Sequence, residues 1–315
     1  MAGDPNSPVF IVGSYRSGTS IFCWCLGQHP EFVNLPETNW LARMSADLDN
    51  WYRLATVNGG FSHLGQTGTS EDEFYRLMAE GVQAVMRSTN PELIQRTERK
   101  PKGELRRRRA PTDPKRRWVD ATPENSHYIY GLARLFPAAR FIHLLRDPHD
   151  VARSLMKFSR TGARDYAHDD AYRTWLRLTR AAWLGERALG GARMLRVRYG
   201  DFTDEPEQAF RRTLAFLGED YSADCLKPLD RKINSSEVEQ DTHLVDGSTA
   251  MAREAEAFYR ELLAAPAPAP GGDAAAQAEL ARRFEQHCRD LAAPPVERIR
   301  RGFTARVRGW LGRTA

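Results

Sequence analysis

Short apolar runs alternate along this chain with longer segments that carry apolar residues on one helical face. Three of the runs are almost wholly apolar and a fourth alternates apolar and basic residues: Val9–Val12, Phe32–Leu35, Phe141–Leu145 and Leu195–Tyr199. Continuous apolar runs are typical of strands that are covered on both faces, as in parallel sheets. The alternation of such strands with helices predicts an α/β fold, a single domain with a central parallel sheet flanked by helices.

The first run leads directly into a glycine- and serine-rich loop, Gly13–Ser20, and then into a predicted helix. Gly13 and Gly18 have the spacing of a phosphate-binding loop, in which backbone N–H groups and a helix N-terminus face an anion. Thr19 stands where a nucleoside triphosphatase has its lysine, and a cation, Arg16, lies inside the loop instead. We therefore expect an anion site that does not hold the end of ATP.

A second candidate anion site follows the third run. Arg146 ends that strand, and a helix is expected from His149, with Pro148 in its first turn, where the missing N–H costs nothing. Ser154 lies eight positions after Arg146 on this helix. A guanidinium and a hydroxyl so placed can converge on one phosphate, although an ion pair between Arg146 and Asp147 is the simpler alternative.

Together these motifs resemble the sulfotransferases that use 3′-phosphoadenosine 5′-phosphosulfate (PAPS). In that family a loop close to [PY]-[KR]-S-G-T-[TS] binds the 5′-phosphosulfate, and this chain reads Tyr15-Arg-Ser-Gly-Thr-Ser20. The family's 3′-phosphate motif is an arginine followed eight positions later by a serine. A later strand ends in a tyrosine and precedes an acid and a helix finishing Phe-Leu-Gly, matched here by Tyr199, Asp201 and residues 216–218.

The resemblance implies a P-loop-type domain and a set of residues that bind PAPS. Ser236 belongs to that set because residues 234–239 faintly resemble a segment that places a serine near the sulfonate. The implied binding residues are Tyr15, Arg16, Ser17, Gly18, Thr19, Ser20, Arg146, Ser154, Tyr199 and Ser236. Tyrosine at a strand end is also common in plain packing. We expect no metal, since the chain has neither an HExxH nor a CxxC motif.

Glu37 is the leading candidate for the catalytic base, and Arg16 for the cation at the transferred group. In the tyrosylprotein branch and related bacterial enzymes, a His-Pro pair and then a Glu-Thr pair follow the loop, and the glutamate of the second pair is catalytic. His29-Pro30 and Glu37-Thr38 match in order, with Glu37 placed 21 residues after Arg16. Glu37 as a helix N-terminal acid is the alternative. His63 is the rival base, because the cytosolic branch uses histidine; it also fits a surface loop.

One departure leaves other functions open. Many relatives carry a lysine after the third strand, and Ala121 occupies that position here. A non-catalytic protein that binds PAPS or its product is therefore one alternative, and an ATP-dependent kinase or triphosphatase is another. The acceptor remains open among a phenolic natural product, as in bacterial secondary metabolism, a lipid or sugar hydroxyl, and a tyrosine. A carboxylate base suits a phenol better than an aliphatic alcohol.

Composition and charge limit the remaining classes of protein to which the chain could belong. The N-terminus has no basic and apolar leader and no window is apolar enough to span a membrane, so we expect a soluble cytoplasmic protein. Cysteines 23, 25, 225 and 288 form no disulfide or metal pattern, and we read the first two as core residues. Residues 95–117 carry a net charge of +8, against +5 for the whole chain. This predicted basic loop lacks the interleaved aromatics of a nucleic-acid binder.

The chain divides into a sulfotransferase-like domain, 1–263, an Ala/Pro/Gly linker, 264–276, and a C-terminal helical extension, 277–315. Within the extension, apolar residues between 296 and 313 fall on one helical face opposite several arginines. Basic amphipathic helices of this kind lie on anionic membranes. Packing on the domain, or on the partner subunit of a homodimer, is the alternative.

Overall fold

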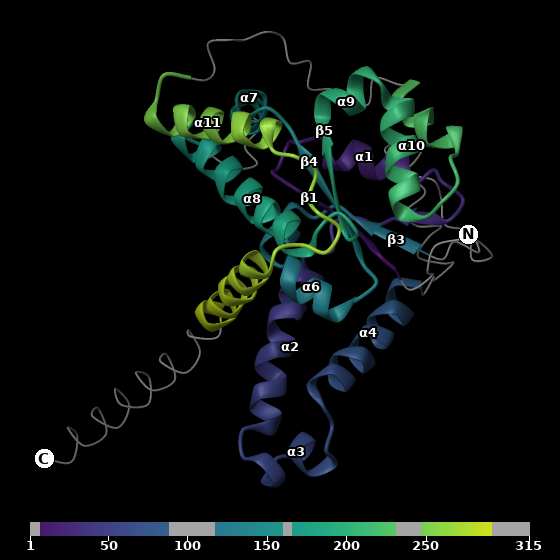
Figure 1. Cartoon of the computed structure of the whole chain (residues 1–315), viewed down its shortest axis with the longest axis vertical. Helices are drawn as coiled ribbons and strands as arrows, with labels where there is room; N and C mark the ends of the chain where they lie inside the picture. Colours follow the sequence, from purple (N-terminus) through teal and green to yellow (C-terminus); the bar gives the residue numbers. More distant parts are fainter. Residues whose placement is uncertain (1–6, 88–116, 160–165, 231–246, 292–315) are drawn as a thin grey trace, which may run out of the picture.

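The structure, a computed structural model, describes residues 7–87, 117–159, 166–230 and 247–291. Its centre is a parallel sheet of five strands in the order β2-β3-β1-β4-β5 (Figure 1). The strands are β1 (Val9–Val12), β2 (Phe32–Asn34), β3 (Arg117–Asp120), β4 (Arg140–Leu145) and β5 (Met194–Arg198). The predicted α/β fold with a central parallel sheet and flanking helices is confirmed.

β1 is the central strand, and every residue of Val9–Val12 is fully buried. Its register pairs Phe10 with Asp120 on β3 and Val12 with His143 on β4. Because all strands run in the same direction, the carboxyl ends of β3, β1 and β4 lie side by side at one edge of the sheet. In open α/β sheets ligands bind at this edge.

Helices cover both faces of the sheet. Ile11 points to the face covered by α1, α9 and α10, where Phe22, Phe202 and Phe210 pack together. Phe10 and Val12 point to the opposite face, covered by α2, α4, α6 and α8. The first set is α1 (Thr19–Leu26), α9 (Tyr199–Asp204), α10 (Pro206–Leu217) and the 3-10 helix η4 (Ala223–Asp230). The second set is α2 (Trp40–Thr56), α4 (Glu71–Arg87), α6 (Ile129–Leu135) and α8 (His168–Leu189).

The helices between β2 and β3 form a helical arm, residues 40–87, which extends away from the sheet (Figure 1). Two short elements at its far end, η1 (Gly59–Phe61) and α3 (His63–Thr67), join α2 to α4. The arm carries exposed apolar side chains, including Trp51 and Phe61, the latter 96% exposed. Its base is anchored in the core by Leu41, Leu48 and Phe74.

The C-terminal part of the described chain packs back on the domain. α7 (Pro148–Ser159) and α11 (Ala250–Ala264) pack with α8 around Trp175. The segment after α11 is hydrogen-bonded to the turn between α8 and β5, since Gly191 N–H donates to the Ala269 carbonyl and Asp273 N–H to that of Arg187. The last described helix covers residues 274–291 and so begins three residues before the predicted start.

The prediction of a basic loop over residues 95–117 is wrong at its last residue. Arg117 is the first residue of β3 and is 2% exposed. Its guanidinium donates to the carbonyl oxygens of Ser7 and Leu217 and pairs with Glu219, and these bonds compensate the cost of burying a charge. The remainder of the basic run lies outside the described residues, as do Ser236 and residues 296–313.

Two other predictions can be compared with the described chain. Cys23 and Cys25 are buried in the core that covers one face of the sheet, as expected. A search of the described helices for a stretch long and apolar enough to cross a membrane finds none.

Candidate functional site

The anion loop, residues 13–20, turns sharply between β1 and α1. Gly13 and Gly18 have φ angles of 138° and 90°, a region that L side chains rarely adopt. A Cβ atom at Gly18 would lie 2.4 Å from the Tyr199 ring, and one at Gly13 would lie 2.6 Å from the Leu144 carbonyl oxygen. Both glycines are therefore required by conformation and by space.

Arg16, with a φ of 63°, is the only non-glycine residue in the described part of the chain that has a left-handed backbone conformation. A residue held in this region costs free energy and persists where the surrounding structure enforces it, often at a functional site. Here the enforcement comes from both sides, because Arg146 Nη1 donates to the Arg16 carbonyl oxygen at 3.0 Å and Arg16 Nε donates to Ser154 Oγ at 2.9 Å. The two predicted anion motifs therefore meet at Arg16.

This arrangement places two cations next to each other. Partial burial, and then the charge of Arg146, lower the pKa of Arg16 from its ordinary value. The carboxylate of Asp150 is 3.8 Å from Arg146 Nε, which is too long for a hydrogen bond and only partly balances the charge. A bound anion would relieve the repulsion between the guanidinium groups.

Several polar atoms of the same region are buried without a hydrogen-bond partner among the described residues. They are Ser14 Oγ, Ser17 Oγ and Arg146 Nε. Leaving such a group unpaired typically costs about 1–3 kcal/mol, so unpaired buried groups are rare in folded proteins. At the N-terminus of α1, moreover, no side chain caps the first helical N–H groups. The donors around this loop fit a phosphate-like ligand.

Tyr199 and Trp175 support the second arginine. The Arg146 guanidinium carbon lies 4.2 Å from the centre of the Tyr199 ring, a cation–π contact, and the Trp175 indole N–H donates to the Arg146 carbonyl at 3.0 Å. Asp147 accepts from the N–H groups of His149 and Asp150 and so caps α7. Tyr199 thus contacts both motifs, since its ring also packs against Gly18.

Glu37 is held at the neighbouring part of the same edge through Thr38 and Asp120. Asp120, at the end of β3, is fully buried and accepts from Thr38 Oγ1 at 2.6 Å. It also accepts from Thr122 N and Oγ1 and from Asn125 Nδ2. Thr38 N–H in turn donates to Thr122 Oγ1 at 2.9 Å. Asp120 therefore anchors the loop that carries Glu37, and its carboxylate is already engaged by four donors.

The electrostatic surroundings make Glu37 a stronger base than an ordinary glutamate. Partial withdrawal from water, and then the negative charge of Asp120, raise the pKa of Glu37. The residue is still exposed to solvent and can therefore be approached by a second molecule. His29, in the His-Pro pair before it, is buried and is held through Nε2 by the Asp220 carbonyl oxygen at 2.9 Å.

The other predicted residues are distributed as follows. Tyr15 is half-buried and packs against the apolar cluster around Trp175, Thr19 is buried, and Ser20 is exposed at the start of α1. His63 is an exposed residue of α3, at the far end of the helical arm, and is not brought to the sheet edge (Figure 1).

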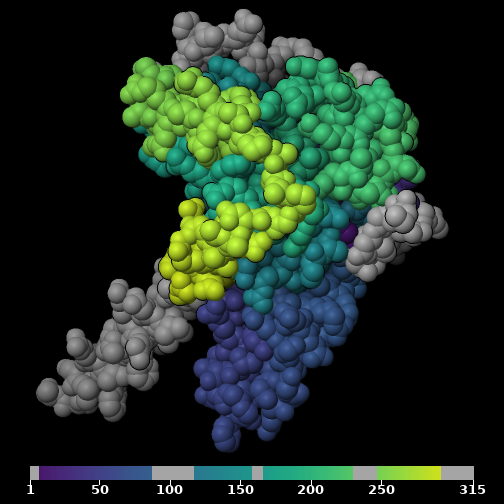
Figure 2. All heavy atoms as spheres, viewed as in Figure 1, coloured from purple at the N-terminus to yellow at the C-terminus, as the bar shows by residue number. Residues whose placement is uncertain are grey.

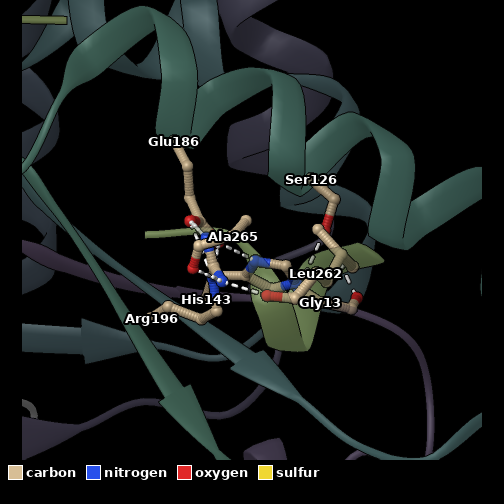
Figure 3. Close-up of polar contacts among 7 residues, drawn as sticks. All are labelled: Gly13, Ser126, His143, Glu186, Arg196, Leu262 and Ala265. Atoms are coloured by element: carbon tan, nitrogen blue, oxygen red, sulfur yellow. Dashed lines mark hydrogen bonds and ion pairs between the residues drawn. The ribbon is translucent and has the colours of Figure 1, made fainter. Parts of the chain in front are cut away.

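Sequence reasoning missed a set of supporting contacts on the α8 side of the sheet. Ser126 Oγ accepts from Gly13 N–H at 3.0 Å, and the buried His143 pairs with Glu186, which also binds Arg196 at 2.8 Å. Figure 3 shows these contacts beside each other behind the loop. The charges of His143 and Arg196 and their hydrogen bonds hold the pKa of Glu186 below its ordinary range despite burial. His143 interrupts an apolar run, which was the one available signal in the sequence.

The arrangement can hold an anion between Arg16, Arg146 and the loop, with a carboxylate base at the adjacent strand. In the described residues, no group of three or more His, Cys, Asp or Glu side chains is placed to hold a metal ion. The prediction of chemistry without a metal therefore stays a prediction.

A sequence model described as "Sulfotransferase family" matches residues 8–223, more than half of the chain, so the chain belongs to the sulfotransferase family. Among curated proteins, it is similar to omega-hydroxy-beta-dihydromenaquinone-9 sulfotransferase Stf3 of Mycobacterium bovis, with 30% identity over 105 residues. The match covers 30% of this chain and 27% of that protein, and the Mycobacterium tuberculosis protein of the same name matches equally. The chain thus spans little more than a quarter of the length of these relatives.

Solved structures of sulfotransferases are similar to the chain at low sequence identity. The sulfotransferase domain of the Synechococcus PCC 7002 olefin synthase has a TM-score of 0.44 and 21% identity, covering 90% of this chain and 95% of that one. Sulfotransferase STF9 from Mycobacterium avium has a TM-score of 0.45 and 16% identity, covering 84% and 78%.

Proposed function

We propose that this protein transfers the sulfuryl group of PAPS to a hydroxyl group of an acceptor. The main support for the proposal is that Arg16 is hydrogen-bonded to both Arg146 and Ser154 at the end of β1. Buried polar atoms without a hydrogen-bond partner among the described residues lie beside these contacts. Membership of the sulfotransferase family supports the same reaction. The loop has Thr19 in place of the triphosphatase lysine, which argues against ATP as the natural ligand.

In this proposal the two phosphate-binding motifs hold the nucleotide. The loop N–H groups and Arg16 bind the 5′-phosphosulfate, while Arg146 and Ser154 bind the 3′-phosphate. PAPS supplies the sulfuryl group, and the sulfur–oxygen bond to its phosphate breaks as a new bond to the acceptor oxygen forms. The chain's own contribution is to orient the donor and to stabilise the charge that develops on the departing phosphate.

Glu37 acts as the general base in this proposal and takes the proton of the acceptor hydroxyl. Its raised pKa brings it closer to the value that general-base catalysis favours near neutral pH. The bond between Thr38 and Asp120 fixes its loop at the strand next to β1. The family lysine is replaced here by Ala121, and in this proposal Arg16 supplies the cation at the transferred group.

The acceptor in this proposal is a small molecule or lipid that carries a hydroxyl group. The name of the similar mycobacterial protein describes the sulfation of an omega-hydroxylated dihydromenaquinone, which supports a lipid hydroxyl as the acceptor. The exposed position of Glu37 fits an acceptor that approaches from solvent or from a lipid surface.

The decisive test replaces the proposed base. Glu37→Gln is expected to lower turnover by roughly a hundredfold or more, since general-base assistance contributes about 10²–10⁴-fold. Affinity for the product nucleotide, 3′-phosphoadenosine 5′-phosphate (PAP), should be retained in calorimetry. Turnover is measured as PAP released from PAPS with 2-naphthol or a long-chain alcohol as acceptor.

His63→Gln is the matched control and should keep the wild-type rate. A normal rate in Glu37→Gln together with a lost rate in His63→Gln would transfer the role to His63. Wild-type protein that binds PAP and transfers nothing to either acceptor would favour a non-catalytic binding protein. Magnesium-dependent hydrolysis of ATP would instead favour a triphosphatase.

A further inference from the structure

A pocket of about 370 Å³ lies outside the proposed transfer site, between α8, the helix of residues 274–291 and the 3-10 helix η3 (Pro123–His127). This volume falls in the range of small-molecule sites. Figure 2 shows the helix of residues 274–291, in yellow, at the surface of the molecule above the helical arm. We call this hollow the cationic pocket because three arginines line it: Arg177, Arg180 and Arg283.

The three arginines differ in how their charges are balanced. Arg180 pairs with Glu254 at 2.6 Å, and Arg283 pairs with Glu279 at 2.5 Å. Arg177 instead donates to Nε2 of His127 at 2.6 Å, and the structure gives it no carboxylate partner among the described residues. Asp290 is the one acidic residue in the lining. Of the three guanidinium groups, that of Arg177 is therefore the one left for an anionic ligand.

His127 does not offset or share that charge. Burial, and then the charges of Arg177 and His287, lower the pKa of His127 to about 4, so the imidazole is neutral at neutral pH. A neutral imidazole that accepts a hydrogen bond orients the guanidinium without neutralising it. The remaining guanidinium donors form a planar fork, which suits carboxylate and phosphate groups.

One part of the lining is apolar. Leu184 on α8 and Leu280 and Phe284 on the neighbouring helix face the same hollow. A site with cationic and apolar walls matches a ligand that has one anionic group attached to an apolar body. Inorganic ions alone would leave the apolar wall in contact with water.

We propose that the cationic pocket binds a small anionic amphiphile, a carboxylate or a phosphate monoester with an apolar body, and that Arg177 is its main charged contact. Ser126 contributes to the lining and also accepts from Gly13 of the anion loop, so the occupied pocket is joined to the transfer site through one side chain. The binding itself does not depend on sulfuryl transfer.

The test uses calorimetry on the full chain, without PAPS, with decanoate and octyl phosphate as probes. Binding to the wild type is expected, and Arg177→Gln should weaken it by roughly tenfold or more, because a hydrogen bond to a charged group contributes about 1.5–3 kcal/mol. The matched control is Arg173→Gln, which removes an exposed arginine of α8 that pairs with Asp170 outside the pocket. It should bind both probes like the wild type.

The proposal would be overturned if Arg177→Gln bound the probes as tightly as Arg173→Gln does, or if the wild type bound neither probe. Thermal unfolding of Arg177→Gln should match the wild type, since the side chain is at the surface, and this separates loss of binding from loss of fold. A further variant, Leu184→Gln, should weaken the binding of both decanoate and octyl phosphate, which reports on the apolar wall.

The anionic amphiphile could be the sulfuryl acceptor itself or a separate effector, and kinetic measurements distinguish the two. If 10-hydroxydecanoate is sulfated and Arg177→Gln raises its KM with little change in kcat, the pocket holds the far end of the acceptor. If decanoate changes the rate with 2-naphthol and is itself not consumed, the pocket holds an effector. Either outcome supports the site, and the calorimetric result stands even if the protein transfers no sulfuryl group.

Discussion

The two halves of the proposed transfer site differ in whether their buried polar groups have hydrogen-bond partners. At the ends of β1 and β4, Ser14, Ser17 and Arg146 each keep a buried polar atom without a partner among the described residues. At the ends of β2 and β3, Asp120 is surrounded by four donors. The first half is incomplete without an anion, whereas the carboxylate anchor of the second is complete in the protein alone.

Because of this difference, the two halves should contribute differently to stability and to ligand binding. Unpaired buried donors make the folded protein less stable and recover that cost only when a ligand arrives. A satisfied network fixes the base loop in advance, which lowers the entropic cost of orienting Glu37. Substitutions in the first half should therefore change the affinity for the nucleotide or the rate with little loss of stability, and those in the second should change stability and rate.

The largest expected effect comes from Arg16→Gln. Removing a preorganised donor at the transferring group typically costs about 10²–10³-fold in rate. The substitution also removes the repulsion with Arg146, so the unliganded protein should be no less stable, apart from the bond to Ser154. Rates of PAP release and thermal unfolding check both parts. Arg43→Gln, at an exposed ion pair on α2, is the control.

Thr38→Val tests the complete half of the site, at the ends of β2 and β3. The change removes the 2.6 Å bond to Asp120 and leaves one acceptor position of a buried carboxylate unfilled. The free energy of unfolding should fall by about 1–3 kcal/mol. Because Glu37 loses its anchor, kcat should fall roughly tenfold. PAP affinity in calorimetry should stay unchanged, and a selective loss of affinity would refute the division into two halves.

Much of the incomplete half could be predicted from the sequence. The spacing of Gly13 and Gly18 and that of Arg146 and Ser154 are local patterns, because each motif lies on one strand and the helix that follows it. The parallel sheet then brings the two strands together, as the register of Val12 with His143 confirms. What the sequence could not give was the direct contact between Arg16 and Ser154, which depends on the left-handed backbone at residue 16.

The complete half was harder to predict. Thr38 and Asp120 are 82 positions apart, and neither stands in a pattern that specifies a partner. The carboxylate of Asp120 is not available to orient an acceptor, because its oxygens are engaged by Thr38, Thr122 and Asn125. The C-terminal helix was expected, whereas its contribution to a pocket with α8 arises only from tertiary packing.

A smaller effect is expected for Ser17→Ala, which probes the incomplete half. Ser17 Oγ is buried and has no partner among the described residues, so its removal should leave the free energy of unfolding within about 0.5 kcal/mol of the wild type, or slightly higher. PAP affinity should fall about fivefold, the value of one hydrogen bond. An unfolding curve shifted as far as that of Thr38→Val would contradict the contrast between the halves.

The smallest effect concerns the pH at which the proposed base loses its function. Glu37 is active as the carboxylate, and its raised pKa means that protonation sets in at a higher pH than for an ordinary glutamate. The acid limb of kcat against pH should therefore lie above the usual glutamate range, and the rate should fall as pH decreases through it. Part of the shift comes from the charge of Asp120, which is fully buried and is therefore screened little, so added salt should leave the limb nearly where it is. The same limb should persist in His63→Gln and disappear in Glu37→Gln; its loss in His63→Gln instead would show that a residue on the helical arm, and not the anchored carboxylate, takes the proton.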